Sequence, residues 1–302
     1  MLCVDIGGTS TKIGVFDSCE RVQILNSIAT RGPAESFADS LCQTIRQAWK
    51  TASRTDAGFL GVGVAVAGFL NDDRDRMIYN SNLPWLEDYP LRYRVANELD
   101  TRVQLEVDSN AAALAEQHLG VGRNSARFLC ITVGTGIGVG MIINGEPVRF
   151  AYGCMGDAGH IVVQANGPLC TCGGHGCAEI LVSAPVLAEE YRIKTRVQSA
   201  VSLRDVIEAA RAGDHVANGI LERAGEWLGI ATASLANVFF PEHIAFAGGL
   251  AEAGDLVMKS LERTFYYSAS KFARDQVTLS RAKLGAMATI TGAAYSILDR
   301  RT

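Results

Sequence analysis

Short apolar runs that end at glycine recur along this chain of 302 residues and predict buried strands followed by tight turns. The first run, at residues 2–7, leads through Gly7-Gly8-Thr9 into a second strand. A later run, at residues 128–133, leads through Gly134-Thr135-Gly136 into a strand that closes on Asn144-Gly145, a strong hairpin signal. This repetition predicts two related halves that face each other.

Two further apolar strands end at residues that bear on chemistry. The strand VQLEV ends at Asp108 and precedes an alanine-rich helix, which Asn110 is expected to cap. The strand HIAFA ends at Gly248-Gly249 before an expected helix. Glycine there lets a ligand approach the helix N-terminus, and a plain strand-to-helix turn is the alternative.

Helical spacing of apolar residues predicts helices near the end of the chain. They cover residues 203–213, 221–239 and 286–300. The second of these helices is apolar enough for burial or for a dimer contact, and we expect burial.

Composition excludes several classes of partner. Apolar residues make up 48% and charged residues 20% of the chain, and the net charge of −4 provides no basic surplus for nucleic acid or an anionic membrane. No signal peptide is visible, and no apolar run reaches the roughly 18 residues that a membrane span needs. We therefore expect a soluble, cytoplasmic protein.

Four candidate metal ligands lie within one short stretch of the sequence, GHIVVQANGPLCTCGGHGC. One imidazole and three thiolates, from His160, Cys170, Cys172 and Cys177, match a closed tetrahedral zinc site, which is structural because it leaves no position for water. His175 in place of His160, or an accidental clustering of cysteines, are the alternatives. The other five cysteines are scattered, and we expect buried free thiols where they lie in apolar runs.

The glycine turns and Asp108 are the candidates for catalysis. The first turn offers backbone N–H groups and the hydroxyls of Thr9, Ser10 and Thr11 to an anion, although glycines that only shape a hairpin would look the same. The patterns GxxxxGK[ST] and GxGxxG are absent. Asp108, at the C-terminal end of a strand, is well placed for a general base, and helix capping is the alternative.

In order along the chain, the motifs DIGGT, GVGVAVAG, NSNLPW, VDSNAAALAE, TVGTGIGVG, GDAGH, CTCGGHGCAE and FAGGL resemble the ROK family (repressors, open reading frames and kinases). The resemblance spans nearly the whole chain. Repressors of the family carry an extra N-terminal helix-turn-helix segment, so we expect a kinase.

The resemblance implies a pair of actin-like, ribonuclease-H-like α/β domains with the active site in the cleft between them. A small domain would comprise residues 1–115, rejoined by the helix at 286–300, and a large domain, residues 116–285, would hold the zinc loop. Asp108 would take the proton from a sugar hydroxyl as it attacks the γ-phosphorus of ATP, and Mg²⁺ would bridge the phosphates.

The resemblance also implies two sets of binding residues. ATP would be bound by Asp5, Gly7, Gly8, Thr9, Thr11, Lys12, Gly134, Thr135, Gly136, Gly138, Gly248 and Gly249. The sugar would be bound by Gly68, Asn82, Asp157, His160 and Glu179, with the structural zinc aiming Glu179 at the sugar.

Three residues depart from the family pattern. Val107 replaces an asparagine that hydrogen-bonds a sugar hydroxyl, Asp157 replaces a glutamate, and Phe150 replaces a glycine. An unpaired hydroxyl costs about 1–3 kcal/mol on burial, so glucose is a weaker expectation than the family alone suggests.

The leading hypothesis is an ATP-dependent kinase of a hexose or N-acetylhexosamine, in a homo-oligomer such as a dimer. A sugar-sensing regulator without turnover is the second hypothesis. An actin-like phosphotransferase acting on a carboxylate is the third, although the zinc loop would have no evident purpose in it.

Overall fold

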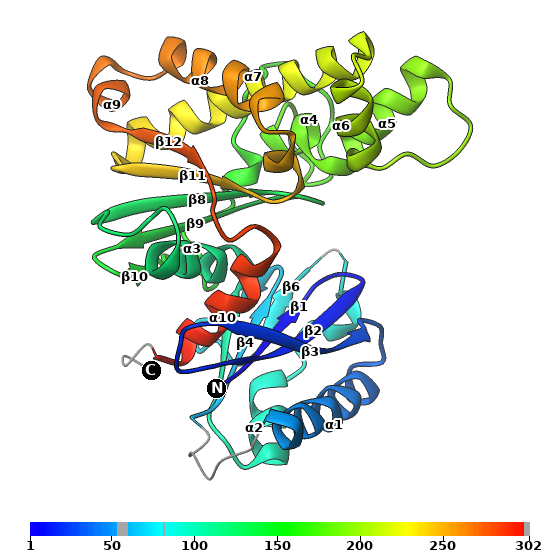
Figure 1. The fold of residues 1–302 in the computed structure, drawn as a ribbon, viewed down its shortest axis with the longest axis vertical. Coiled ribbons are helices and arrows are strands. Elements are labelled where there is room, and N and C mark those ends of the chain that lie inside the picture. Colours follow the sequence, from blue (N-terminus) through cyan, green and yellow to red (C-terminus); the bar gives the residue numbers. More distant parts are fainter. Residues whose placement is uncertain (53–59, 81, 299–302) are drawn as a thin grey trace. The chain divides into compact units, whose positions relative to one another are not determined.

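The computed structural model describes residues 1–52, 60–80 and 82–298 and divides into two compact units. The first unit comprises residues 1–123, 140–156 and 286–302, and the second comprises residues 124–139 and 157–285. The structure contains two five-stranded sheets with helices packed against them (Figure 1), and residues 140–147 of the second sheet are grouped with the first unit.

The sheet of the first unit has the order β3-β2-β1-β4-β7. Its strands are β1 (Leu2–Ile6), β2 (Ser10–Phe16), β3 (Val22–Ala29), β4 (Val62–Val66) and β7 (Val103–Val107). Strands β1, β2 and β3 are antiparallel, whereas β1, β4 and β7 are parallel. The residues of the parallel strands are almost all buried, because helices cover both faces of this part of the sheet.

Helices of the first unit pack against the two faces of this sheet. They are α1 (Ala34–Ala52), α2 (Leu91–Leu99), α3 (Asp108–Leu119) and α10 (Ala288–Leu298). Shorter elements are β5 (Phe69–Leu70), β6 (Met77–Tyr79), η1 (Pro84–Leu86) and η4 (Gly285–Met287). The predicted C-terminal helix is confirmed as α10, and its predicted end at residue 300 lies outside the described residues.

Two glycines let helix α10 approach its neighbours very closely. A Cβ at Gly63 on β4 would lie 1.7 Å from the carbonyl oxygen of Ala293, and one at Gly292 would lie 1.6 Å from that of Ala111 on α3. Backbone therefore packs against backbone where α10 crosses the sheet and α3.

The second sheet has the order β10-β9-β8-β11-β12. Its strands are β8 (Arg127–Val133), β9 (Ile137–Ile143), β10 (Glu146–Pro147), β11 (His243–Ala247) and β12 (Thr278–Arg281). Both sheets have a hairpin of consecutive strands on one side and parallel strands on the other. This shared strand order confirms the prediction of two related halves.

The second unit contains most of the helices. They are η2 (Ala158–His160), α4 (Ala178–Val182), α5 (Ala184–Thr195), α6 (Leu203–Arg211), α7 (His215–Phe239), η3 (Gly249–Ala253), α8 (Asp255–Ser268) and α9 (Lys271–Gln276). Helix α7 is longer than predicted because Asp214 caps it, accepting hydrogen bonds from the N–H groups of Val216 and Ala217. Its apolar residues pack against α8, where Gly225 and Gly229 meet the α8 backbone, so the expectation of burial is confirmed.

One local expectation was wrong. Asn110 does not cap α3, because the helix begins at Asp108 and the amide of Asn110 instead donates to Glu106 and to the carbonyl of Gly153. The helix expected after Gly248-Gly249 is present as the short 3₁₀ helix η3, and the α-helix α8 follows from Asp255.

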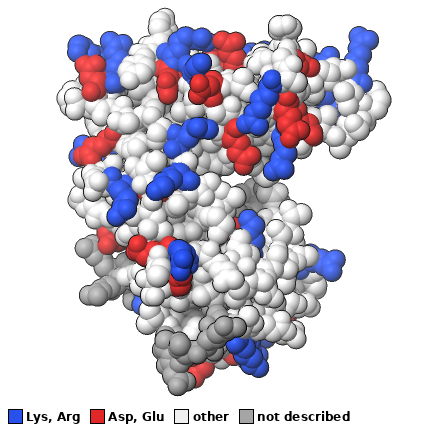
Figure 2. Space-filling model, in the orientation of Figure 1, with Lys and Arg blue, Asp and Glu red and all other residues white. Residues whose placement is uncertain are grey.

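Acidic and basic side chains are interspersed on the face drawn in Figure 2. Among the described residues, no helix combines the length and the apolar character that crossing a membrane requires.

Candidate active site

Three parallel strands of the first unit end in one row. Ile6, Val66 and Val107 are in register across β1, β4 and β7. The residues that follow, including Gly7 and Asp108, therefore leave the sheet at the same edge, which is where ligands bind in open α/β sheets.

The turn after β1 is open to solvent at Gly8, Thr9 and Ser10. Thr11, in contrast, is buried, and its hydroxyl lies 2.7 Å from that of Thr30. Of the three hydroxyls that we expected at this turn, that of Thr11 is thus engaged inside the unit.

Two charged residues flank this turn on β1 and β2. The Nζ of Lys12 lies 3.9 Å from a carboxylate oxygen of Asp5. Burial raises the pKa of Asp5, and the charge of Lys12 partly offsets that rise. The pair places an acidic and a basic side chain next to the turn.

Asp108 is the first residue of α3 and is partly buried. Burial raises the pKa of Asp108 to about 6, while the N–H of Ser109, which donates to its carboxylate at 2.7 Å, opposes the rise. This backbone N–H is its one hydrogen-bond donor among the described residues. The carboxylate is ionised at neutral pH and keeps free lone pairs to accept a proton.

Gly68 and Asn82 lie beyond the end of β4. Gly68 has φ +98°, and a Cβ there would lie 2.3 Å from the carbonyl oxygen of Tyr79, so no other residue fits. The buried side chain of Asn80 accepts the N–H of Asn82 at 2.7 Å and donates to the carbonyl of Ala67 at 2.8 Å. Asn82 itself is exposed.

The second unit has a matching pair of strand ends. Thr132 on β8 and Ala247 on β11 are in register in parallel strands, so the turns at residues 134–136 and 248–249 are neighbours. Gly248 has φ +84°, and a Cβ there would lie 2.4 Å from the carbonyl oxygen of Val133. Close packing of these two turns therefore requires glycine.

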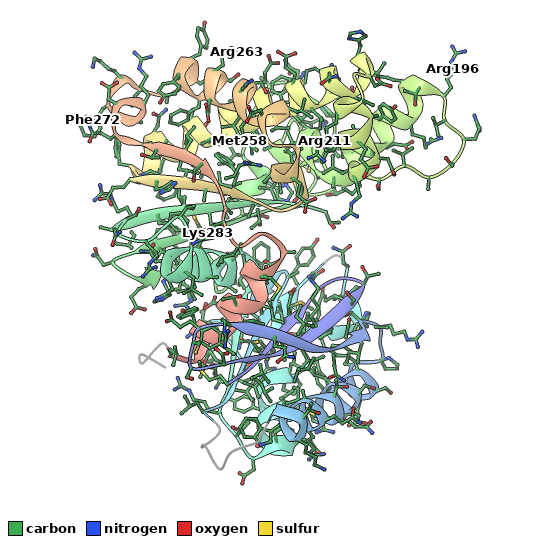
Figure 3. All side chains as sticks on the ribbon, in the orientation of Figure 1. Arg196, Arg211, Met258, Arg263, Phe272 and Lys283 are labelled. Atoms are coloured by element: carbon green, nitrogen blue, oxygen red, sulfur yellow. The ribbon has the colours of Figure 1, made fainter. Side chains whose placement is uncertain are left out.

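Further contacts hold these turns in place. Arg211 of α6, labelled in Figure 3, donates to the carbonyl of Glu252 in η3 at 2.7 Å and so fixes the element that starts at Gly249. The hydroxyl of Thr132 donates to the carbonyl of Gly138 at 3.1 Å. Thr135 is exposed at the tip of its turn.

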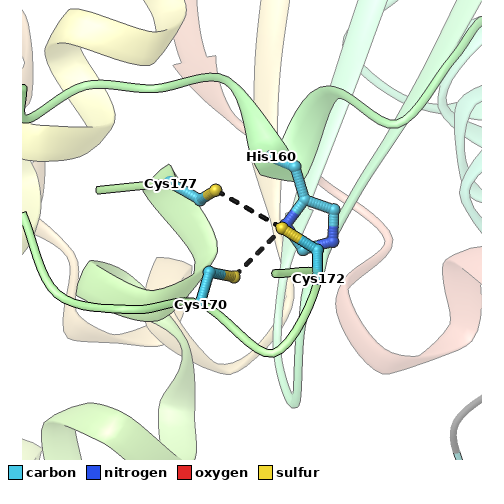
Figure 4. Close-up of side chains that lie close together, drawn as sticks. All are labelled: His160, Cys170, Cys172 and Cys177. Atoms are coloured by element: carbon cyan, nitrogen blue, oxygen red, sulfur yellow. Dashed lines mark hydrogen bonds between the residues drawn. The ribbon is translucent and has the colours of Figure 1, made fainter. Parts of the chain in front are cut away.

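His160, Cys170, Cys172 and Cys177 form the candidate metal centre, and their ligand atoms all lie within 4.8 Å of one another (Figure 4). The Sγ atoms of Cys172 and Cys177 are 3.7 Å apart, and the Sγ of Cys170 is 3.5 Å from the Nδ1 of His160. With Zn–S of about 2.3 Å and Zn–N of about 2.0 Å, an ideal tetrahedron requires an S···S separation of about 3.8 Å and an S···N separation of about 3.5 Å. The residues present therefore fit zinc. His175 is exposed and is not part of this set.

The metal centre is connected to the glycine turn through Glu179. One carboxylate oxygen of Glu179 accepts the N–H of Ile137, just after the turn, at 2.8 Å. The other lies 3.9 Å from the Nε2 of His160, and the exposed Asp157 lies 3.6 Å from the same nitrogen. A Cβ at Gly136 would lie 2.5 Å from Glu179, which explains the glycine there.

A buried cluster of ion pairs beside Asp108 in the sequence was not predicted. Glu106 is fully buried on β7 and forms ion pairs with Arg74 and Arg149. The signal available in the sequence was a glutamate inside the apolar strand VQLEV, because a buried charge needs a partner.

Comparison with known protein families connects these features. The ROK family model matches residues 1–300. The chain belongs to the ROK family. It is 30% identical to a glucokinase of Streptomyces coelicolor, over 96% of this chain and 95% of that protein. It is also 30% identical to a putative xylose repressor of Caldicellulosiruptor sp., over 88% of this chain and 69% of that protein.

The fold of this ROK protein is that of the family's sugar kinases. The crystal structure of a ROK family glucokinase from Streptomyces griseus, in complex with glucose and AMPPNP, is similar with a TM-score of 0.84 and 30% identity, covering 98% of both chains. The predicted actin-like α/β fold is thereby supported, and sugar kinases are among its homologues.

Proposed function

We propose that this chain is an ATP-dependent kinase that phosphorylates a hydroxyl of a hexose or N-acetylhexosamine, with Asp108 as general base. The similarity to glucokinases over nearly the full chain supports the reaction class. The observation that carries the assignment is Asp108, a carboxylate with free lone pairs at the edge where three parallel strands end.

The chemistry of Asp108 suits this role. A sugar hydroxyl is a weak nucleophile and must lose its proton as its oxygen attacks the γ-phosphorus. A carboxylate with a pKa of about 6 is ionised at neutral pH and is a stronger base than an ordinary aspartate. After transfer, the proton resides on Asp108 and the phosphoryl group on the sugar, with ADP as the second product.

The glycine turns would bind the nucleotide. In the first unit, the exposed backbone of the turn at Gly8, Thr9 and Ser10 would face phosphate oxygens, and a hydrogen bond from the N–H of Gly7 to the carbonyl of Ser10 holds this turn. In the second unit, the turn at residues 134–138 would do the same, and Gly248-Gly249 would lie at the adenosine. Mg²⁺ bound with ATP would offset the charge that develops on the phosphates.

The proposed sugar contacts are Gly68 and Asn82, beyond the end of β4, and Asp157, His160 and Glu179, beside the candidate metal centre. Zinc, when bound, would act structurally by fixing the loop that carries the latter three. Val107 and Asp157, which is one methylene shorter than glutamate, would tune which sugar hydroxyls are accepted.

A regulator without turnover is the second candidate, and the similarity to a putative xylose repressor favours it. In such a protein sugar would bind without any consumption of ATP. Isothermal calorimetry combined with an ADP assay separates the two functions.

The test is an ADP-release assay with glucose, mannose, fructose, allose and the two common N-acetylhexosamines. We expect sugar-dependent ADP release by the wild type and a loss of about 100-fold or more in kcat for Asp108→Asn. Asp100→Asn is the matched control, because this exposed residue has φ +48° and asparagine adopts that conformation readily. Unchanged kcat in Asp108→Asn would refute the assignment of the base. Sugar binding without ADP release would favour the regulator.

A further inference from the structure

Glu106 is a fully buried carboxylate on strand β7. Its Oε2 accepts hydrogen bonds from the guanidinium groups of Arg74, at 3.1 Å, and of Arg149. Its Oε1 accepts from the backbone N–H of Val107 at 3.0 Å and from the side-chain amide of Asn110 at 2.8 Å. Each oxygen of Glu106 thus has two donors, all from the first unit.

Asn110 connects this cluster to the segment that follows β10. The amide nitrogen of Asn110 also donates to the carbonyl of Gly153 at 2.8 Å. A Cβ at Gly153 would lie 3.3 Å from Cγ2 of Val107 and 3.1 Å from Cβ of Leu70. The cluster therefore holds Gly153 against the strand end that leads into Asp108.

The same cluster fixes the first turn of α3. Val107, at the N-cap position, makes no side-chain capping hydrogen bond. Such a bond from serine, threonine, asparagine or aspartate usually fixes the start of a helix. Here Glu106 and Asn110, which flank Asp108 in the sequence, are joined directly to each other across the turn. Their bond sets the direction in which Asp108 leaves the strand.

Stability alone does not account for this arrangement. Burying one carboxylate and two guanidinium groups carries a desolvation cost, and an apolar cluster of the same volume is often at least as stable. Arg74 also has φ +49°, a left-handed conformation that is uncommon for residues other than glycine. The benefit of the cluster is therefore expected in the geometry that it imposes.

We propose that Glu106 and Asn110 are positioning residues for the Asp108 base, and that Arg74 and Arg149 hold Glu106 in place. They act through Asp108 and through the segment at Gly153. The inference rests on the proposed kinase function. It gives a role to Glu106, Arg74 and Arg149, to which the sequence analysis assigned none, and gives Asn110 a role other than the helix cap first expected.

The test compares Asn110→Ala and Glu106→Gln with a control variant, Arg94→Met. Arg94 forms ion pairs with Glu35, Asp39 and Glu98 in the same unit, so its loss removes a more exposed charge network that shares no residue with the Glu106 cluster. We expect kcat to fall about 10-fold or more in Asn110→Ala and Glu106→Gln, with KM for ATP within about twofold of the wild type. In Arg94→Met only the melting temperature is expected to fall.

A melting temperature that falls in Asn110→Ala while kcat stays within about twofold, as in Arg94→Met, would overturn the proposal. Asn110→Ala removes no charge, so it decides the question even where Glu106→Gln does not fold.

Hydrogen exchange provides a readout that does not need turnover. Faster exchange in Asn110→Ala at both residues 107–113 and residues 149–154 is expected, and unchanged exchange would contradict the positioning role. A wild type that phosphorylates no sugar would refute the kinase function, and exchange would still decide the positioning.

Discussion

Burial makes Asp108 a stronger base and also lowers the stability of the folded protein. Its charged form is disfavoured by burial, which is why its pKa rises to about 6. The burial that makes this carboxylate a better base therefore also destabilises the folded state in which the carboxylate is ionised.

Asp108→Asn should therefore stabilise the protein. The pKa in the folded state, about 6, is above the unfolded value of about 3.9, so the folded state binds the proton more tightly. The free energy of unfolding of the wild type then falls as pH rises from about 4 to about 6, a loss that asparagine avoids. We expect the variant to be more stable by at most about 3 kcal/mol near pH 8, and equally stable near pH 4.

Denaturant unfolding at both pH values checks this expectation. A variant that is no more stable than the wild type near pH 8 would mean that the charge of Asp108 is well solvated in the folded state.

The same titration predicts the pH dependence of catalysis. A general base must be ionised, so kcat/KM for the sugar at saturating Mg-ATP should rise with pH through about 6 and then level off. Initial rates measured from about pH 5 to pH 8.5 test this prediction. A profile that stays flat below pH 6 would argue that no group with the pKa of Asp108 acts as the base.

Single residues were predictable where a motif or a strand end marks them. Asp108 and the four metal ligands follow from local sequence, and the structure brings the four ligands together. The pairing of Thr11 with Thr30 and of Glu106 with Arg74 and Arg149 was not predictable, since these partners lie far apart in the chain and no local pattern connects them.

The metal loop, helix α4 and the second glycine turn form one connected element in the second unit. Cys177 is the N-cap of α4, and Glu179 in the first turn of that helix accepts the N–H of Ile137. The N–H of Ala184, at the start of α5, donates to the carbonyl of Gly134 at 2.8 Å. Movement of the metal loop is therefore transmitted to the turn.

Loading the protein with zinc and then removing the metal with a chelator should loosen this turn. We expect hydrogen exchange at residues 134–139 to become about 10-fold faster, with α8 unaffected as an internal control. Cys170→Ser and Glu179→Ala should show the same change in part. Glu179→Gln should show less, because its amide oxygen can still accept the N–H of Ile137. Exchange that is insensitive to the metal would contradict the coupling.

Two helical glycines offer a matched test of close packing. Gly292→Ala should destabilise the protein by about 2 kcal/mol or more, because its Cβ would clash with the carbonyl of Ala111. Gly219→Ala on α7 should stabilise it by about 0.5–1 kcal/mol, because the nearest atom is the flexible end of Arg223 at 3.7 Å and alanine favours helix. Thermal unfolding measures both changes, and a loss of stability in both variants would contradict this account of Gly292.

Elements were predicted well where periodicity or a hairpin signal was strong. The two strand-turn-strand repeats and helix α10 lie as expected, and Asn144-Gly145 has positive φ at both residues, as its hairpin requires. The start of α3 was predicted incorrectly, since a tertiary contact of Asn110 outweighed its local preference for the cap.

The chain repeats one strand order twice, and the two candidate nucleotide-binding turns occupy the same place in each repeat. In each sheet a glycine turn follows the first strand of the hairpin, next to parallel strands that end at the same edge. Similarity to glucokinases and to a putative xylose repressor then leaves catalysis as the property to be established.

Mass spectrometry of the sugar after incubation with Mg-ATP shows directly whether the protein catalyses sugar phosphorylation. The account predicts a singly phosphorylated sugar with the wild type and with Asp100→Asn, and almost none with Asp108→Asn. Unmodified sugar from the wild type across the whole panel, or equal product from Asp108→Asn, would contradict it.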